Sequence, residues 1–177
     1  MNIMLIGGGG REHAILRSLK KNPAVETVWM LPGNGAMESE AICTGIGATD
    51  LDGIVAFAKA NKVDYAVVAP DDPLVLGCVD RLNELGIPCF GPKANAAIIE
   101  GSKAFSKDLM KKYGIPTAAY EIFTELPKAL EYLKTCPIPT VVKADGLALG
   151  KGVIIAMTRE EAVEAVTDMM ANAKFGK

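Results

Sequence analysis

The stretch TVVKADGLALGKG, from Thr140 to Gly152, organises the second half of the chain. It begins as a β-branched apolar run ending at Lys143, opens into a loop that contains several glycines, and leads into a second apolar run over residues 153–157. This order predicts a strand, a glycine loop and a second strand. Glycines let backbone N–H groups approach an anion closely, and Lys143 and Lys151 add positive charge. The pattern favours a bound polyphosphate; a long solvated hairpin loop is the alternative.

The stretch differs from a Walker-type P-loop. That motif needs Gly-x-x-x-x-Gly-Lys followed by Ser or Thr and then a helix. Here Gly146 and Gly150 are one residue too close, Gly152 follows the lysine, and a strand pattern comes next. We expect the loop over Asp145–Lys151 to be mobile when no nucleotide is bound, because its residues bury little apolar surface.

Composition excludes several classes of function for the 177 residues. Nineteen basic against 21 acidic residues give a net charge of −2, so there is no basic excess to attract nucleic acid or a membrane surface. No apolar run approaches the ~18 residues of a membrane helix. The four cysteines are scattered without a Cys-x-x-Cys pair, which predicts free thiols in a reducing compartment. We expect a cytoplasmic protein that binds neither nucleic acid nor membrane.

The N-terminus combines a strand, a glycine turn and a helix. An apolar run over Asn2–Ile6 precedes four glycines, and helical spacing follows over Arg11–Lys21. This arrangement is the usual geometry for binding an anion at a helix N-terminus. The dinucleotide fingerprint fails in detail, because Glu12 or His13 stands where its third glycine belongs. A nicotinamide cofactor is therefore not expected.

Polar residues near the ends of two predicted strands are candidates for ligand contacts. Arg11 lies in the first helical turn, within reach of an anion there, or is simply an exposed helix residue. His13 is the only histidine, and we expect it to be packed or hydrogen-bonded rather than bound to a metal. Asp71 and Asp72 follow the apolar strand at 65–69, at the rim where α/β sheets bind ligands. They are equally well explained as turn and helix-cap residues.

The alternation of strands and helices predicts an α/β fold in two domains. Over residues 1–101, four or five short strands alternate with helices, one of which runs to Leu85, and this predicts a doubly wound parallel sheet. Ser102 can cap a helix over Lys103–Tyr113 and begins a second unit, 102–177. That unit has the order β-α-β-β-α, starting from an extended stretch at 117–123, and is thin for an independent core.

Several segments together resemble the phosphoribosylamine–glycine ligase family of the ATP-grasp superfamily. They are GGGGREHA (7–14), PGNGA (32–36), PLV (73–75), FGP (90–92), GSK (101–103), VKADGLA (142–148) and GKGV (150–153). The resemblance covers essentially the whole chain in order. It implies a Rossmann-like pre-ATP-grasp domain over 1–101, then the start of an ATP-grasp domain truncated at its C-terminus. Asp71 departs from the family, which usually has Glu at this position.

The resemblance also implies a reaction. ATP phosphorylates the carboxylate of glycine, and 5-phosphoribosylamine attacks the glycyl phosphate to give glycinamide ribonucleotide, ADP and phosphate in purine biosynthesis. The implied ATP-binding residues are Lys103, Lys143, Asp145, Gly146, Gly150, Lys151 and Gly152. The implied phosphoribosylamine-binding residues are Gly8, Gly9, Gly10, Arg11, Glu12 and Asp71.

Family length bears on what the chain can do. Family members are much longer, and their Mg²⁺ ligands are expected beyond residue 177. We therefore expect an inactive fragment with no assigned catalytic residue. Another ATP-grasp carboxylate–amine ligase, which the GGGGREHA segment disfavours, and a non-catalytic nucleotide-binding module are the alternatives.

Overall fold

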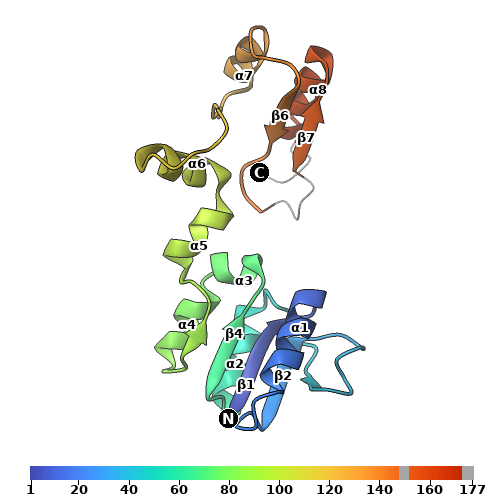
Figure 1. Cartoon of the computed structure of the whole chain (residues 1–177), viewed down its shortest axis with the longest axis vertical. Coiled ribbons are helices and arrows are strands. Elements are labelled where there is room, and N and C mark those ends of the chain that lie inside the picture. Colours follow the sequence, from blue (N-terminus) through green and yellow to red (C-terminus); the bar gives the residue numbers. More distant parts are fainter. Residues whose placement is uncertain (148–151, 173–177) are drawn as a thin grey trace. The chain divides into compact units, whose positions relative to one another are not determined.

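The computed structural model describes residues 1–147 and 152–172, and the chain divides into two compact units, Met1–Gly101 and Ser102–Lys177. The elements of the first unit are β1 (Asn2–Gly7), α1 (Gly10–Leu19), β2 (Thr27–Pro32), β3 (Ile42–Cys43), α2 (Leu51–Ala60), β4 (Tyr65–Val68), α3 (Asp71–Val75), α4 (Cys78–Glu84), β5 (Cys89–Phe90) and α5 (Ala94–Gly101). The strands form one parallel sheet in the order β3-β2-β1-β4-β5, and Figure 1 shows β1 between β2 and β4. The prediction of a doubly wound parallel sheet is confirmed.

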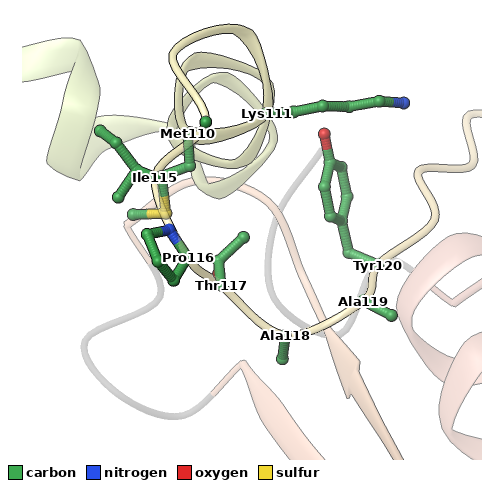
Figure 2. A pocket seen from close by; sticks show the side chains of 9 residues that line it. Met110, Lys111, Ile115, Pro116, Thr117, Ala118, Ala119 and Tyr120 are labelled. Carbon is green, nitrogen blue, oxygen red and sulfur yellow. The ribbon is translucent and has the colours of Figure 1, made fainter.

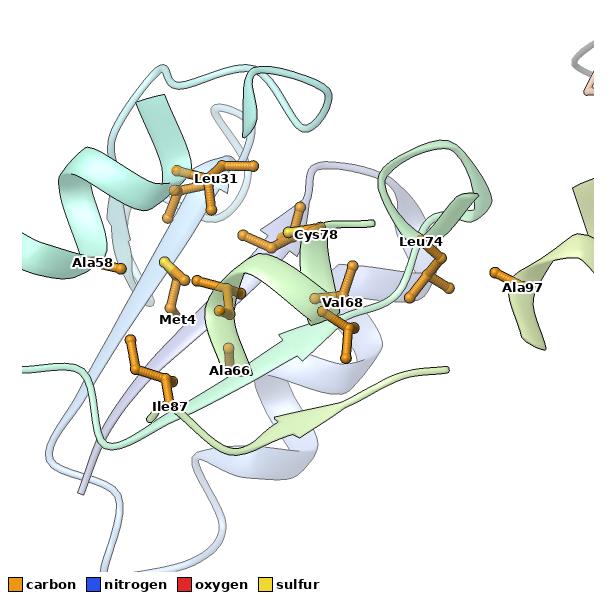
Figure 3. Close-up of a cluster of buried hydrophobic side chains, with 13 residues drawn as sticks. Met4, Leu31, Ala58, Ala66, Val68, Leu74, Cys78, Ile87 and Ala97 are labelled. Atoms are coloured by element: carbon orange, nitrogen blue, oxygen red, sulfur yellow. The ribbon is translucent and has the colours of Figure 1, made fainter. Parts of the chain in front are cut away.

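The central strand β1 explains why this sheet is buried on both faces. Successive side chains of a strand point to opposite faces, so a continuous apolar run supplies two cores. Met4 and Ile6 belong to a cluster that includes residues of α2 and α4 (Figure 3), whereas Ile3 and Leu5 pack with Leu16 of α1 on the other face. Helices therefore cover both faces, and the strand ends remain free to carry loops.

Two helices of the first unit differ from the sequence prediction. The single helix expected to end at Leu85 is two helices, α3 and α4, because Gly77 between them adopts a left-handed conformation with φ 86°. The prediction was therefore wrong at this point. The sequence pattern also missed α5, whose first residue, Ala94, donates its backbone N–H to Asp80 Oδ2 at 2.8 Å.

The second unit contains α6 (Lys103–Lys112), α7 (Leu126–Leu133), β6 (Thr140–Lys143), β7 (Val153–Ala156) and α8 (Arg159–Met170). The two strands form the expected antiparallel hairpin. Its inner face packs on α7 and α8 through a small core that includes Leu133, Ala156 and Val166. A capping box begins α8, since Thr158 Oγ1 accepts the Glu161 N–H at 3.2 Å.

The stretch at 117–123 forms no strand, so the expected β-α-β-β-α order was wrong at its first element. Side chains of α6 hold this extended segment instead: Lys107 Nζ donates to Thr117 Oγ1 at 2.7 Å and to the Ala118 carbonyl at 2.9 Å. A shallow groove of about 430 Å³ lies beside it, lined by Met110, Lys111 and residues 114–120 (Figure 2). Within the described ranges, none of the helices combines the length and the apolar character needed to cross a bilayer.

Candidate functional site

The glycine turn after β1 is a close-packed junction of two loops. The N–H of Gly33 donates to the Gly7 carbonyl at 3.2 Å, and Asn34 Nδ2 donates to the Gly8 carbonyl at 2.6 Å. A Cβ at Gly8 would lie 2.5 Å from the Gly33 carbonyl oxygen. The loop that follows β2 is thus held directly against the turn that follows β1, which fixes the backbone at the N-terminus of α1.

Glu12 stabilises this turn from inside. Its Oε2 accepts the Gly9 N–H at 2.6 Å, and only 4% of the residue is exposed. Its second oxygen, Oε1, is buried and has no hydrogen-bond partner among the described residues. Buried carboxylate oxygens are normally hydrogen-bonded, so Oε1 is an acceptor available to a ligand donor.

The outer side of the turn carries the groups that suit an anion. Gly9 is the N-cap of α1 and has no side chain to cap the first-turn N–H groups. Gly9, Gly10 and Arg11 are all exposed. The N-terminal N–H groups and the positive end of the helix dipole therefore face solvent beside a guanidinium group, which is a suitable arrangement for a phosphate.

His13 and Glu40 fasten the loop at residues 33–41 to α1. Glu40 Oε1 lies 2.9 Å from His13 Nε2 and accepts from Arg17 Nη2 at 2.9 Å. These partners lower the pKa of Glu40 to about 2, chiefly through the hydrogen bond from Arg17 and then through that from His13. The prediction that His13 is hydrogen-bonded is confirmed.

Asp71 begins α3 and is partly buried, directly after Pro70. A Cβ at Gly7 would lie 2.9 Å from Pro70 Cγ, so the segment after β4 touches the glycine turn after β1. The ends of β1 and β4 thus bring Arg11, Glu12 and Asp71 to the same edge of the sheet. This edge contains the switch point between β1 and β4, where open α/β sheets bind ligands.

In the second unit, the first turn of α6 meets the base of the glycine loop. Ser102 Oγ donates to Asp145 Oδ2 at 2.9 Å, and the Ala104 N–H donates to Asp145 Oδ1 at 3.1 Å. Lys103 Nζ donates to the Gly146 carbonyl at 2.6 Å. Three of the predicted ATP-binding residues are therefore brought together: Lys103 contacts Gly146 directly, and the residues on either side of Lys103 contact Asp145. These contacts join residues that are 41–43 positions apart in sequence.

The hairpin holds further members of the predicted set. Lys143, at the end of β6, is exposed on the face of the hairpin opposite the core, and it pairs with Val153 across the strands. Gly152 is buried, and its carbonyl accepts the Ala144 N–H at 2.9 Å, which extends the hairpin towards the loop. Gly150 and Lys151 lie outside the described residues, as does the part of the mobility expectation that concerns residues 148–151.

An apolar surface next to Lys143 was not predicted from the sequence. Val141 and Ile155 face each other across the strands and are 49% and 66% exposed, and Val153 and Met157 continue the same face. The outer face of the hairpin, meaning these four residues, is a flat apolar surface beside an ammonium group. Alternation of polar and apolar residues along a strand shows which side faces out. Every residue over 153–157 is apolar, so the sequence of β7 lacks this signal.

Groups of metal-ligating side chains and the two surface grooves add no site residue within the described ranges. No group of three His, Cys, Asp or Glu side chains there could hold a metal ion, and the Mg²⁺ ligands that the resemblance implies are expected beyond residue 177. A second groove, of about 320 Å³, lies along α1, β4 and β5 in the first unit; its lining is Ile15, Ser18, Leu19, Tyr65, Val67 and Phe90. Neither groove includes a predicted site residue.

Comparison with known proteins gives consistent matches along the chain. Residues 1–100 match the family model "Phosphoribosylglycinamide synthetase, N domain", and residues 101–177 match "Phosphoribosylglycinamide synthetase, ATP-grasp (A) domain". The chain is 51% identical over 179 aligned residues to a phosphoribosylamine–glycine ligase of Vibrio vulnificus strain YJ016, covering 100% of this chain and 42% of that protein. It thus spans less than half the length of this relative.

Solved structures agree with these matches. A phosphoribosylamine–glycine ligase from Thermotoga maritima is similar with a TM-score of 0.79 and 33% identity, covering 99% of this chain and 41% of that one. The biotin carboxylase domain of a Hydrogenobacter thermophilus 2-oxoglutarate carboxylase, solved with MgADP, has a TM-score of 0.72 over 96% of this chain and 42% of that one; at 19% identity it shows a shared fold only. With more than half of its residues in one family model, the chain belongs to the phosphoribosylglycinamide synthetase family.

Proposed function

We propose that this chain supplies the phosphate-binding parts of an ATP-dependent ligase that joins glycine to 5-phosphoribosylamine. The reaction proceeds through glycyl phosphate and gives glycinamide ribonucleotide, ADP and phosphate, a step of purine biosynthesis. The two consecutive family matches and the name of the Vibrio vulnificus relative support it. A carboxylate is a poor electrophile, so phosphorylation by ATP is what makes glycine reactive towards an amine.

The observation that carries the proposal is the contact of Lys103 Nζ with the Gly146 carbonyl at 2.6 Å. It places an ammonium group at the base of a glycine loop, three residues beyond Lys143 in the same unit. Phosphoryl transfer depends on preorganised cations and backbone donors around the phosphates. In this proposal Lys103 and Lys143 bind the ATP phosphates, together with the backbone of the loop.

The outer face of the hairpin suits the base of the same nucleotide. An adenine ring has two apolar faces, and Val141 and Ile155 offer a flat apolar surface two residues from Lys143 along β6 and one strand across. Burying part of this surface under a base contributes about 25 cal/mol per Å². The arrangement assigns the phosphates to the lysines and the base to the aliphatic side chains.

The glycine turn of the first unit suits the phosphate-bearing substrate. Exposed first-turn N–H groups of α1 and the Arg11 guanidinium can bind its phosphate. Glu12 Oε1, buried and unpaired among the described residues, can accept a hydrogen bond from the amine or a hydroxyl of 5-phosphoribosylamine. Asp71 lies at the same sheet edge and can accept another, with a shorter reach than the usual Glu.

The proposal extends to the metal and the compartment. Mg²⁺ would accompany ATP, as it accompanies ADP in the Hydrogenobacter thermophilus domain, with ligands outside the described residues. It would neutralise phosphate charge when bound. All four cysteines are free, which supports the reducing environment of the cytoplasm.

A chimaera tests the function directly. This chain replaces the matching segment of the Vibrio vulnificus ligase, to which it is 51% identical, and glycinamide ribonucleotide is measured from ATP, glycine and 5-phosphoribosylamine. We expect the chimaera to form product and Lys143→Ala to reduce the amount formed. Lys59 is an exposed lysine of α2, and Lys59→Ala should leave product formation unchanged. A folded chimaera that binds ATP and forms no glycinamide ribonucleotide contradicts the assigned reaction.

A further inference from the structure

Both oxygens of the Asp145 carboxylate are engaged by the first turn of α6. Ser102 Oγ bonds to Oδ2 and the Ala104 N–H to Oδ1, at 2.9 and 3.1 Å. Ser102 is also the N-cap of α6, because its hydroxyl accepts the Phe105 N–H at 3.1 Å. Asp145, two residues after the end of β6, is thus a second cap for the same helix.

Lys103 stands between the two residues that hold Asp145. Its backbone belongs to the first turn of α6, and its ammonium reaches the carbonyl of Gly146, the residue after Asp145. The N-cap Ser102 and the first two residues of α6 therefore contact two consecutive residues at the base of the loop, Asp145 and Gly146. A long lysine side chain has many rotamers, and these contacts limit where its ammonium lies.

The charge of Asp145 argues against direct contact with a triphosphate. Burial alone raises the pKa of Asp145, but the hydrogen bonds from Ala104 and Ser102, with further backbone N–H groups, outweigh this and lower it below its usual value. The group is therefore a carboxylate at neutral pH. A carboxylate repels phosphate oxygens, and both of its own oxygens are already hydrogen-bonded.

From this geometry we propose that Asp145 and Ser102 are positioning residues that fasten the glycine-loop base to the N-terminus of α6 and so hold the Lys103 ammonium at the ATP phosphates. The inference rests on the proposed function of this unit as the ATP site. It replaces the expectation that Asp145 itself binds ATP. Asp145 acts through Lys103, and its contribution disappears when Lys103 is absent.

The direction in which Asp145→Ala changes ATP affinity distinguishes a positioning role from a purely electrostatic one. If the carboxylate only repelled phosphate, or filled a phosphate position at the helix N-terminus, Asp145→Ala would tighten ATP binding. If it positions Lys103, Asp145→Ala weakens ATP binding, by about tenfold on the scale of one hydrogen bond to a charged group. The double variant Asp145→Ala/Lys103→Ala then binds ATP as Lys103→Ala alone does, because the two act as one unit.

The experiment uses the 177-residue chain and measures ATP affinity by calorimetry, with thermal unfolding of each variant alongside. Ser102→Ala should weaken ATP binding as Asp145→Ala does, and Ser102→Thr, which keeps the hydroxyl, should restore it. Asp50→Ala is the matched control, because Asp50 Oδ1 caps α2 by accepting the Gly53 N–H at 3.0 Å. It should lower thermal stability without changing ATP affinity.

A second measurement needs no nucleotide. The amide resonance of Ala104 should titrate with a midpoint below the usual Asp range in the wild-type chain, and this titration should vanish in Asp145→Asn. Its absence from the wild-type chain refutes the contact and the inference with it.

The outcomes separate the inference from the proposed function. Wild-type ATP binding with unchanged or tighter binding by Asp145→Ala overturns the inference alone, as do additive effects in the double variant. A wild-type chain that shows the Ala104 titration and binds no ATP overturns the proposed function, and the positioning role with it.

Discussion

Replacing Gly8 by alanine tests whether the junction between the glycine turn and the loop after β2 is as tight as the structure indicates. The new Cβ would lie 2.5 Å from the Gly33 carbonyl oxygen, and ordinary contact begins at 3.4 Å, so the loop must retreat by about 0.9 Å. That movement stretches the Gly33–Gly7 and Asn34–Gly8 hydrogen bonds, now 3.2 and 2.6 Å.

The expected cost follows from these two effects. Overpacking of this kind costs about 1–3 kcal/mol, and each lost hydrogen bond about 0.5–1.5 kcal/mol. We expect Gly8→Ala to lower the free energy of unfolding of the first unit by about 2–6 kcal/mol, the sum of the overpacking and of the two hydrogen bonds. Gly10→Ala is the matched control two residues away: nothing lies within 4 Å of its Cβ, and alanine at this first helical position is favoured over glycine by up to about 1 kcal/mol.

Urea unfolding followed by tryptophan fluorescence measures both variants. Trp29, the single tryptophan, lies in β2 and packs edge-on against Phe57 at 5.7 Å between ring centroids, so it reports on the first unit. Equal urea midpoints for Gly8→Ala and the wild type would refute the tight junction. A large loss in Gly10→Ala would show that any side chain in the turn is harmful and that the contact with Gly33 is not the cause.

Four further changes test the charge network and the assigned sites. Glu40→Gln should lower the urea midpoint of the first unit above about pH 5, and the difference from the wild type should fade as the pH falls to 2. The reason is that a carboxylate whose pKa is lowered from 4.5 to about 2 stabilises the fold only while it is ionised. A difference that persists at pH 2 contradicts this. Lys143→Ala should weaken ATP binding about tenfold in calorimetry, on the scale of one charge-assisted hydrogen bond, with Lys59→Ala unchanged. Arg11→Ala should weaken binding of ribose 5-phosphate, a stable probe for the phosphate-bearing substrate, and leave ATP affinity unaltered; the reverse pattern would reassign the turn. Ile155→Ser should weaken ATP binding several-fold without changing the affinity for tripolyphosphate, which lacks the base. Equal losses of affinity for both probes would contradict the assignment of the base to the outer face of the hairpin.

Much of the fold could be predicted because its local signals are strong. The apolar run that forms β1 indicated a strand of a parallel sheet, and Thr158 followed by Glu161 three residues later is a capping-box pattern typical of a helix start, here that of α8. The split at Gly77 was missed because a glycine within a helical pattern is often tolerated, and only its backbone conformation shows the break. The helix α5 was missed because its sequence, ANAAIIEG, has polar side chains only at Asn95 and Glu100 and therefore shows little helical periodicity.

The candidate site was predictable in its residue types and not in their partners. Glycines and lysines at characteristic spacing indicated phosphate binding, but the spacing contains nothing about where Asp145 would go. Its partners lie 41 and 43 residues earlier, and such a contact depends on how the hairpin packs rather than on any local pattern. The unpaired oxygen of Glu12 is similarly invisible in sequence, since it results from the burial of one helical residue behind a turn.

The two-stranded sheet of the second unit has a consequence for handling the protein. In the described part of the chain each of its strands has only one neighbour, so both outer edges present unpaired backbone N–H and C=O groups. The segment from Val153 to Met157 carries no charge, no proline and no glycine. Open edges with such sequences are templates for intermolecular strand pairing, which natural proteins suppress by covering the edge or charging it. Solubility of the 177-residue chain should therefore depend on concentration and be limited by this hairpin, and a lysine introduced on its outer face should raise it.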